Sequence, residues 1–172
     1  NPFLSFAFLH ALHESGSAAP ETGWQPQYIV LYDGEELAAA LPLYVKGHSY
    51  GEYVFDWAWA DAYQRHGLAY YPKLLSAIPF TPVAGPRLMA VDAEARAALI
   101  DVLAATQAAT EVSSTHVLFP PEEHARQLAD AGFMLRSGVQ FHWLNQGYKS
   151  FDEFLATLEQ KKRKNIRAER RK

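Results

Sequence analysis

The sequence predicts a mixed fold of the α/β (α+β) class, in which a sheet that opens with antiparallel strands is covered by helices. Three observations lead to this expectation. Two apolar runs flank an Asp-Gly pair near the start of the chain, helical and strand patterns alternate after them, and 49% of the 172 residues are apolar while 20% are charged. This balance excludes a disordered chain, and the element order excludes a helical bundle and a β-sandwich.

The first third of the chain is predicted to form a helix, a hairpin and one more strand. Asn1 and Pro2 have the residue types of a helix start, and Gly16 is a typical stop. The Asp33-Gly34 pair supplies the positive φ of a tight turn, so the apolar runs on its two sides form an antiparallel hairpin. The expected elements are a helix over 1–16, strands over 27–32 and 37–45, and a third strand over Tyr53–Trp59.

The remaining elements alternate. Asp92 is a helix cap, and Ser150 with Glu153 forms the capping box of the last helix. A Pro- and Gly-rich loop separates these elements from the opening strands. The expected elements are a short helix near 72–78, a helix from Asp92 to about Thr110, a strand over His116–Phe119, a helix over Pro121–Ala131, a strand over Val139–Asn145, and a helix from Phe151 into the C-terminal residues.

Basic residues are concentrated at the end of the sequence. Residues 1–160 contain eight basic and eighteen acidic residues, a balance of −10, whereas residues 161–172 contain eight basic residues and one acidic residue, a balance of +7. Such an asymmetry predicts an anionic partner for the tail: another part of the protein, a phosphate or a nucleic acid. The alternative is a solvated helix face. The chain has no Cys, which excludes disulfides, thiolate metal sites and a Cys nucleophile.

Two short motifs allow a functional and a simpler interpretation. His10 and His13 lie one helical turn apart, but no third ligand follows at a readable spacing, so we expect a polar helix edge and no metal. Residues 64–69 (QRHGLA) match the pattern with which acetyl-CoA-dependent transferases wrap backbone amides around a pyrophosphate at a helix start. The same loose pattern also arises by chance in a chain of this length.

The segment GEYVFDWAWADAY, residues 51–63, raises the main question. Tyr53, Trp57 and Trp59 share one parity, so in a strand they could all face a core. A core strand does not explain why several Asp and Tyr residues follow directly after it. We therefore expect a buried Trp57 near the sheet centre, with Trp59 and Tyr63 beside a pocket that also contains Asp61.

Four stretches together carry a resemblance: GEYVFDWAWADAY, YYPKLL followed by PFTPVAGPRL, QFHWLNQGY, and SFDEFLATLEQKKRKNIRAERRK. They resemble the FemAB-like (peptidoglycan biosynthesis/recognition) family of the acyltransferase superfamily with the GNAT fold. The resemblance implies a protein similar to the Fem transferases, which move an aminoacyl group from aminoacyl-tRNA onto an amine of a peptidoglycan precursor. It also implies a GNAT-like first subdomain over 1–149, and a basic helix over 150–172 that leads to a second subdomain absent from this chain.

This chemistry is aminolysis of an activated ester or thioester, which needs a neutral amine close to a polarised carbonyl. Asp56 and Asp61 are the expected catalytic carboxylates, which hold the incoming ammonium group and take its proton. The expected substrate-binding residues are Tyr53, Trp57, Trp59 and Tyr63, which pack against peptide or sugar, and Arg87, which clamps a carboxylate or phosphate.

We expect a cytoplasmic protein with no tightly bound cofactor. Aminoacyl-tRNA or acyl-CoA is the expected co-substrate, and the sequence does not decide between a monomer and an oligomer. Three alternatives remain at this stage. The first is an acyl-CoA-dependent N-acyltransferase that acts on another amine. The second is a non-catalytic module that recognises cell-wall precursors, and the third is an RNA-binding protein that works through its basic tail.

Overall fold

The computed structural model describes residues 1–171, which fall into two compact units, one that ends at Leu135 and one that begins at Arg136. The first unit contains all strands of the described chain. Its helices are η1 (Pro2–Leu4), α1 (Phe6–Glu14), η2 (Pro20–Thr22), α2 (Trp57–Arg65), α3 (Ala93–Ala108) and α4 (Glu122–Asp130). Its strands are β1 (Gln25–Pro26), β2 (Ile29–Asp33), β3 (Glu36–Leu41), β4 (Tyr44–Lys46), β5 (Lys73–Ser76), β6 (Met89–Ala90) and β7 (Thr115–Val117).

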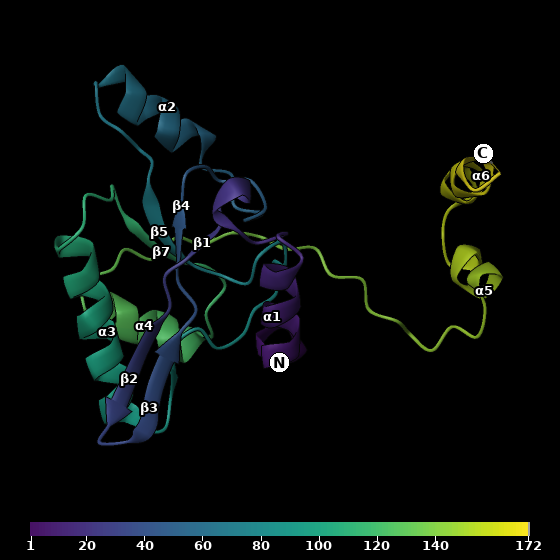
Figure 1. Cartoon of the computed structure of the whole chain (residues 1–172). Helices are drawn as coiled ribbons and strands as arrows, with labels where there is room; N and C mark the ends of the chain where they lie inside the picture. Colours follow the sequence, from purple (N-terminus) through teal and green to yellow (C-terminus); the bar gives the residue numbers. More distant parts are fainter. Residues whose placement is uncertain (172) are drawn as a thin grey trace. The chain divides into compact units, whose positions relative to one another are not determined.

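The strands form two sheets, which confirms the predicted mixed α+β class. One sheet has the order β1-β4-β5-β7 and the other β2-β3-β6. All neighbours are antiparallel except β5 and β7, which run parallel and are separated in the chain by β6 and α3. Figure 1 shows α2 at the opposite end of this unit from the turn between β2 and β3.

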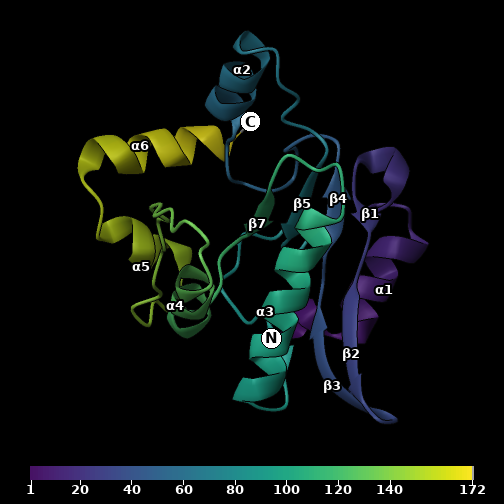
Figure 2. The same ribbon diagram turned by 90° about the vertical axis from the view of Figure 1, so that its left-hand side faces the viewer.

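Strand β5 lies between two hydrophobic cores, because all four of its residues are buried. Leu74 packs with Leu99 and Leu103 of α3 and with Leu128 of α4. The next residue, Leu75, packs with Trp24 and Tyr44 and with Leu12 of α1. Since neighbouring residues of a strand face opposite sides, helices cover both faces of the sheet, as predicted. Figure 2 shows α3 alongside the β2–β3 hairpin.

The predicted hairpin is confirmed, but the second predicted strand is divided. Strands β2 and β3 pair from Ile29↔Leu41 to Asp33↔Glu36 around Gly34, whose φ of +60° is the positive value that the turn requires. The run over 37–45 then breaks at Pro42, which lacks the N–H that a ladder needs. Strand β3 therefore belongs to one sheet and β4 to the other.

Two predicted elements are wrong in type. The expected strand over Tyr53–Trp59 is a loop followed by α2, which begins at Trp57. Alternating Trp and Ala fit a strand and a helix equally well, and Ala is the best helix former. The expected helix near 72–78 is the buried strand β5. Its short apolar run has no period that distinguishes a strand from a buried helix.

The other helices of the first unit lie near their predicted places. Asp92 caps α3 by accepting a hydrogen bond from the backbone N–H of Ala95. Helix α4 ends just before Gly132, which has a φ of +94°. The first predicted helix is two elements, because Asn1 caps only the short η1 and Ser5 caps α1.

The second unit contains α5 (Phe151–Ala156) and α6 (Gln160–Glu169). The cap at Ser150 is confirmed, because Ser150 Oγ accepts from the Glu153 N–H at 3.1 Å. The Glu153 carboxylate accepts from the Lys149 N–H, one residue before the cap, so the reciprocal half of the expected capping box is not formed. The single helix expected from Phe151 onward is wrong, because α5 ends before Thr157. Arg163 donates to the Leu158 carbonyl in the break at 2.6 Å.

Residues 139–145 contain no strand, contrary to the prediction. Their side chains alternate as a strand requires, but a strand exists only where a neighbouring strand accepts its ladder of hydrogen bonds. No such partner is present among residues 136–171, and Phe141 is 97% exposed. The subdomain boundary expected between residues 149 and 150 stays a prediction.

Candidate functional site

The candidate site is an open pocket of about 480 Å³ between α2 and residues 68–71. One wall is a face of α2, and its lining residues follow the i, i+3, i+4, i+7 spacing of one helix face. The other wall is the segment that leads into β5. The lining residues are Trp57, Ala60, Asp61 and Gln64 on the helix and Leu68, Ala69, Tyr70 and Tyr71 on the segment.

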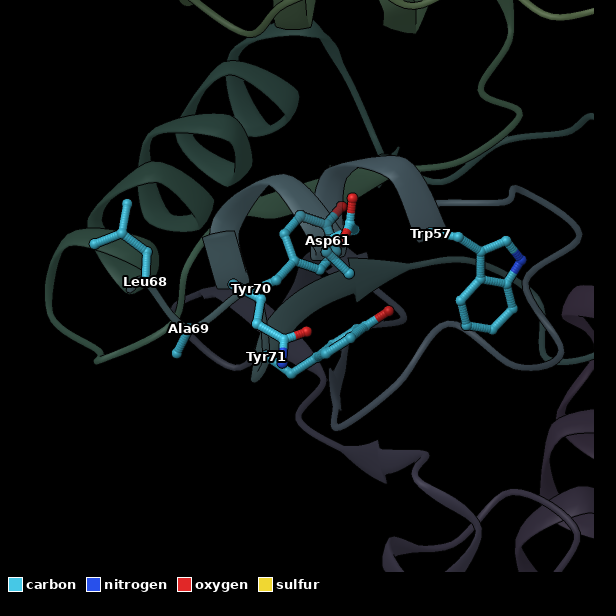
Figure 3. Close-up of a pocket in the computed structure, with 8 residues that line it drawn as sticks. Trp57, Asp61, Leu68, Ala69, Tyr70 and Tyr71 are labelled. Atoms are coloured by element: carbon cyan, nitrogen blue, oxygen red, sulfur yellow. The ribbon is translucent and has the colours of Figure 1, made fainter. Parts of the chain in front are cut away.

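The pocket combines aromatic surface with one carboxylate. Figure 3 shows Trp57 at one end, Leu68 and Ala69 at the other, and Asp61 between them, where it overlaps the Tyr70 ring in this view. Trp57 and Asp61 are accessible, since Trp57 is 47% exposed and the Asp61 side chain 61%. The Asp61 carboxylate pairs with Arg65 one helical turn further on, at 2.7 Å. Exposed pairs of this kind exchange readily with other cations, so Asp61 remains available to a ligand.

A buried cluster of charges lies behind the pocket, and Lys73 of β5 is its centre. The Lys73 ammonium nitrogen donates to Asp56 Oδ2 at 2.6 Å, to Glu52 Oε2 at 2.8 Å and to Ser49 Oγ at 2.9 Å. The side chains of Lys73, Glu52 and Asp56 are at most 1% exposed. Three acceptors use all three protons of the ammonium group.

The surroundings change the pKa values in this cluster in different directions. Burial alone would raise the pKa of Asp56, but the hydrogen bond and the charge of Lys73 outweigh it and lower that pKa. Burial raises the pKa of Glu52 despite the charge of Lys73, and its Oε1 has no hydrogen-bond partner. Burial also lowers the pKa of Lys46 from 10.5 to about 8.

Two Tyr residues connect the cluster to the pocket. The hydroxyl of Tyr71 lies 2.8 Å from Ser49 Oγ, which is itself bonded to Lys73. The side chain of Tyr70 makes a hydrogen bond with Asp56, which adds to the lowering of its pKa. Both Tyr residues also line the pocket, so the floor of the pocket is bonded to the buried ions.

The structure places two of the predicted site residues at the pocket. Trp57 and Asp61 line it, whereas Tyr53, Trp59 and Tyr63 do not. The prediction of a buried Trp57, with Trp59 and Tyr63 beside the pocket, is wrong because the segment is helical: Trp57 and Asp61 share a face of α2, and Trp59 and Tyr63 lie on others. Tyr63 packs edge-on against Tyr70 at 5.1 Å.

Asp56 and Arg87 do not fit their predicted roles in this conformation. A catalytic carboxylate must reach the amine, but Asp56 is buried against Lys73 and does not line the pocket. Arg87 is completely buried, and its guanidinium donates to the carbonyls of its own loop, at Val83, Gly85 and Pro86. Burial lowers the pKa of Arg87 to about 10. Arg87 therefore stabilises its loop.

The phosphate-binding interpretation of QRHGLA is wrong for a physical reason. Gln64 and Arg65 are the last residues of α2, and Gly67 follows its C-cap. A helix C-terminus presents carbonyls and a negative dipole end, which repel an anion.

His13 bonds the Ala18 carbonyl and the Tyr28 hydroxyl through its two ring nitrogens. Within residues 1–171, no group of three or more His, Asp or Glu side chains could hold a metal ion.

Sequence reasoning missed the centre of the cluster. Lys46 and Lys73 both occur in apolar runs, LYVK and KLLS, where a Lys must be either at an edge or paired when buried. A Lys within an apolar run is therefore a sign of a buried ion pair, and the aromatic segment before Lys73 contains the two acidic partners, Glu52 and Asp56. The sequence could not show that the loop over 47–56 folds back onto β5.

One comparison with known proteins identifies a family. A family model described as FemAB-like, peptidoglycan biosynthesis/recognition, matches residues 1–172. No curated protein and no solved structure matches the chain. Among residues 1–171, no helix is both long and apolar enough to cross a membrane.

Proposed function

The chain belongs to the FemAB-like family of peptidoglycan biosynthesis or recognition, and on this premise we propose that it is a Fem-like aminoacyl or acyl transferase of the GNAT-fold superfamily. The pocket beside α2 is its acceptor site. It takes the free amine of a peptidoglycan precursor peptide, and the product is an amide on that amine.

One observation carries this proposal: Asp61 lies in the pocket among Trp57, Tyr70 and Tyr71. A carboxylate attracts a primary ammonium group, and the faces of aromatic rings also favour a cation. The same rings provide apolar surface for the aliphatic stem that bears the amine. A peptide side chain that ends in an amine has both features.

Asp61 is also the proposed general base. The bound ammonium loses one proton to the Asp61 carboxylate, which later passes it to water, and the neutral nitrogen then attacks the carbonyl carbon of the donor ester. A C–N bond forms and the ester C–O bond breaks. The second proton of the nitrogen leaves with the expelled ester oxygen, so that an amide and an alcohol result.

The donor is expected to be anionic, since both aminoacyl-tRNA and acyl-CoA carry phosphates. In the second unit, Arg163 donates to the carbonyls of Ala156, the last residue of α5, and Leu158. Arg167 pairs with Asp152 of α5, and Arg170 lies over the Phe151 ring. Lys161 lies on the face of α6 opposite to these residues, and Lys162 and Lys164 lie on the two flanks of that face, all three exposed. We propose that this free face meets the phosphates of the donor, tRNA in the first instance.

The acceptor proposal is tested by calorimetric titration with a UDP-muramoyl pentapeptide that has a free side-chain amine. Wild-type protein should bind it, and acetylation of the amine should abolish binding because the positive charge is lost. Asp61→Asn should weaken binding about tenfold or more, while Asp101→Asn on the exposed face of α3 should not. Equal binding of the free and acetylated peptides would refute the proposed site.

A non-catalytic recognition module is the second candidate, and one observation favours it. Asp61 is the only carboxylate among the lining residues, because Asp56 is held by Lys73. Incubation with aminoacyl-tRNA and the precursor distinguishes the two functions. A new amide that disappears in Asp61→Asn supports the transferase, and binding without any amide supports recognition alone.

A further inference from the structure

The pocket has walls from two separate parts of the chain, and hydrophobic burial holds the first of them only weakly, through half-buried residues such as Tyr63, which packs against Tyr70. No residue of α2 is buried, and its N-cap residue Asp56 makes no side-chain cap bond. A helix is normally fixed by the apolar face that it buries. The position of α2 therefore depends also on polar interactions.

The strongest of these interactions is at the residue that precedes the helix. Asp56 is followed directly by Trp57, the first residue of α2, and its carboxylate is 2.6 Å from the Lys73 ammonium. Charge-assisted hydrogen bonds of this length are about twice as strong as neutral ones. The start of α2 is thus bonded to the middle of the sheet.

The second wall is bonded to the same nitrogen. Tyr71 precedes β5 by two positions, and its hydroxyl contacts Ser49 Oγ at 2.8 Å. Ser49 Oγ in turn accepts from Lys73 at 2.9 Å. The Asp56 bond holds one wall and the Ser49–Tyr71 chain holds the other, so one ammonium group is bonded to both walls, in addition to the direct Tyr70–Asp56 hydrogen bond and the Tyr63–Tyr70 ring contact.

We propose that Lys73 is a positioning residue of the pocket, which holds α2, and with it Trp57 and Asp61, against Tyr70 and Tyr71. Lys73 does not contact a ligand itself, because it is completely buried. Only the identity of the ligand rests on the proposed function. The mechanical role of Lys73 is independent of it.

Two matched substitutions separate positioning from general stability. Asp56→Asn removes the charged bond to the start of α2 and leaves the Lys73–Glu52 pair at 2.8 Å. Glu52→Gln removes the other carboxylate and leaves the bond to α2 at 2.6 Å. Each substitution removes one of the two carboxylate partners of Lys73, but only Asp56→Asn breaks the bond to the start of α2. Since each leaves Lys73 with a charged partner, both are expected to fold.

The test measures hydrogen exchange of the α2 amides relative to those of β5, together with the ¹⁹F signal of fluorotryptophan at position 57. In Asp56→Asn, exchange in α2 should accelerate about tenfold or more and the Trp57 signal should shift, while β5 remains protected. In Glu52→Gln, exchange in α2 should stay within about twofold of wild type. Arg96→Met, which breaks the pair of α3 with Glu123 on α4, should leave α2 unchanged.

Unchanged exchange of α2 in Asp56→Asn would overturn the proposal, and so would equal acceleration in both variants. Binding of the UDP-muramoyl pentapeptide provides a second readout, which should weaken in Asp56→Asn more than in Glu52→Gln. If wild-type protein does not bind this probe, the proposed function fails. The exchange data still decide the role of Lys73, because they need no ligand.

Discussion

Lys46 and Lys73 are directly opposite each other on the antiparallel strands β4 and β5, and both are completely buried. Like charges at opposed positions repel, because their Cβ atoms are about 5 Å apart. The two side chains reduce this repulsion with different partners. Lys73 meets the carboxylates of Glu52 and Asp56, whereas Lys46 donates to the Tyr50 carbonyl and lies 3.7 Å above the Trp24 ring.

Lys46 should make stability depend on pH under alkaline conditions. Burial lowers its folded-state pKa from 10.5 to about 8, so between these values the unfolded chain binds more protons than the folded one. The free energy of unfolding should therefore rise with pH in this window, by up to about 1.4 kcal/mol per pH unit, and this contribution is lost as pH falls through 8. Urea unfolding of wild type and Lys46→Met from pH 7 to 10 measures it. Parallel curves for the two proteins would contradict the assignment.

Trp57 and Trp59 form a matched pair for the pocket, because they are the same residue on the same helix with similar exposure, 47% and 49%. Only Trp57 lines the pocket. Trp57→Ala should weaken binding of the precursor peptide about tenfold, the usual effect of losing an aromatic contact. Trp59→Ala should leave binding nearly unchanged. Calorimetry on both variants checks this ranking, and the reverse order would move the site to another face of α2.

Gly51 and Gly34 should respond differently to the same substitution. Both have positive φ, +80° and +60°, which costs an Ala roughly 1–2 kcal/mol at either position. A Cβ at Gly34 meets nothing within 4 Å, but at Gly51 it would be 2.6 Å from the Phe80 ring. Gly51→Ala should therefore destabilise the protein by about 2–4 kcal/mol, more than Gly34→Ala. Chemical denaturation of both variants measures the difference, and equal values would show that the Phe80 ring moves freely.

Ser150 should stabilise α5 locally. Its hydroxyl accepts from the Glu153 N–H at 3.1 Å, and loss of such a cap typically costs about 1 kcal/mol. Ser150→Ala should speed exchange of the amides in α5 about fivefold, while the amides of α3 stay protected. Thr157→Ala at the other end of α5 is the control. Its hydroxyl contacts a carbonyl rather than a free N–H, so its effect should be smaller.

Part of this fold is visible in local sequence. The turn at Gly34 and the helix caps at Asp92 and Ser150 depend on residues that are near each other in the chain, and the structure confirms all three. Elements that depend on distant partners were predicted less well. Strand β5 has its neighbours in β4 and β7, and nothing within its own four residues identifies them.

The residues of the candidate site divide in the same way, into those that the local sequence marks and those whose role depends on distant parts of the chain. Trp57 and Asp61 were singled out from composition, because an aromatic and acidic segment is unusual in any fold, and both line the pocket. Lys73 was not, since its role comes from a loop that folds back over it. Arg87 was assigned to a ligand because the sequence could not show that its own loop supplies the carbonyl acceptors.

The position of β5 between its neighbours also has a consequence for the order in which the molecule folds. The β2–β3 hairpin closes over a two-residue turn and can form within microseconds. Strand β5 must instead find β4 about 30 residues earlier and β7 about 40 residues later, and such non-local pairing is slow. Lys73 reaches its carboxylates only when β5 is in place. The binding pocket should therefore be among the last parts to mature, and a newly made chain should acquire its native hairpin well before it acquires affinity for a ligand.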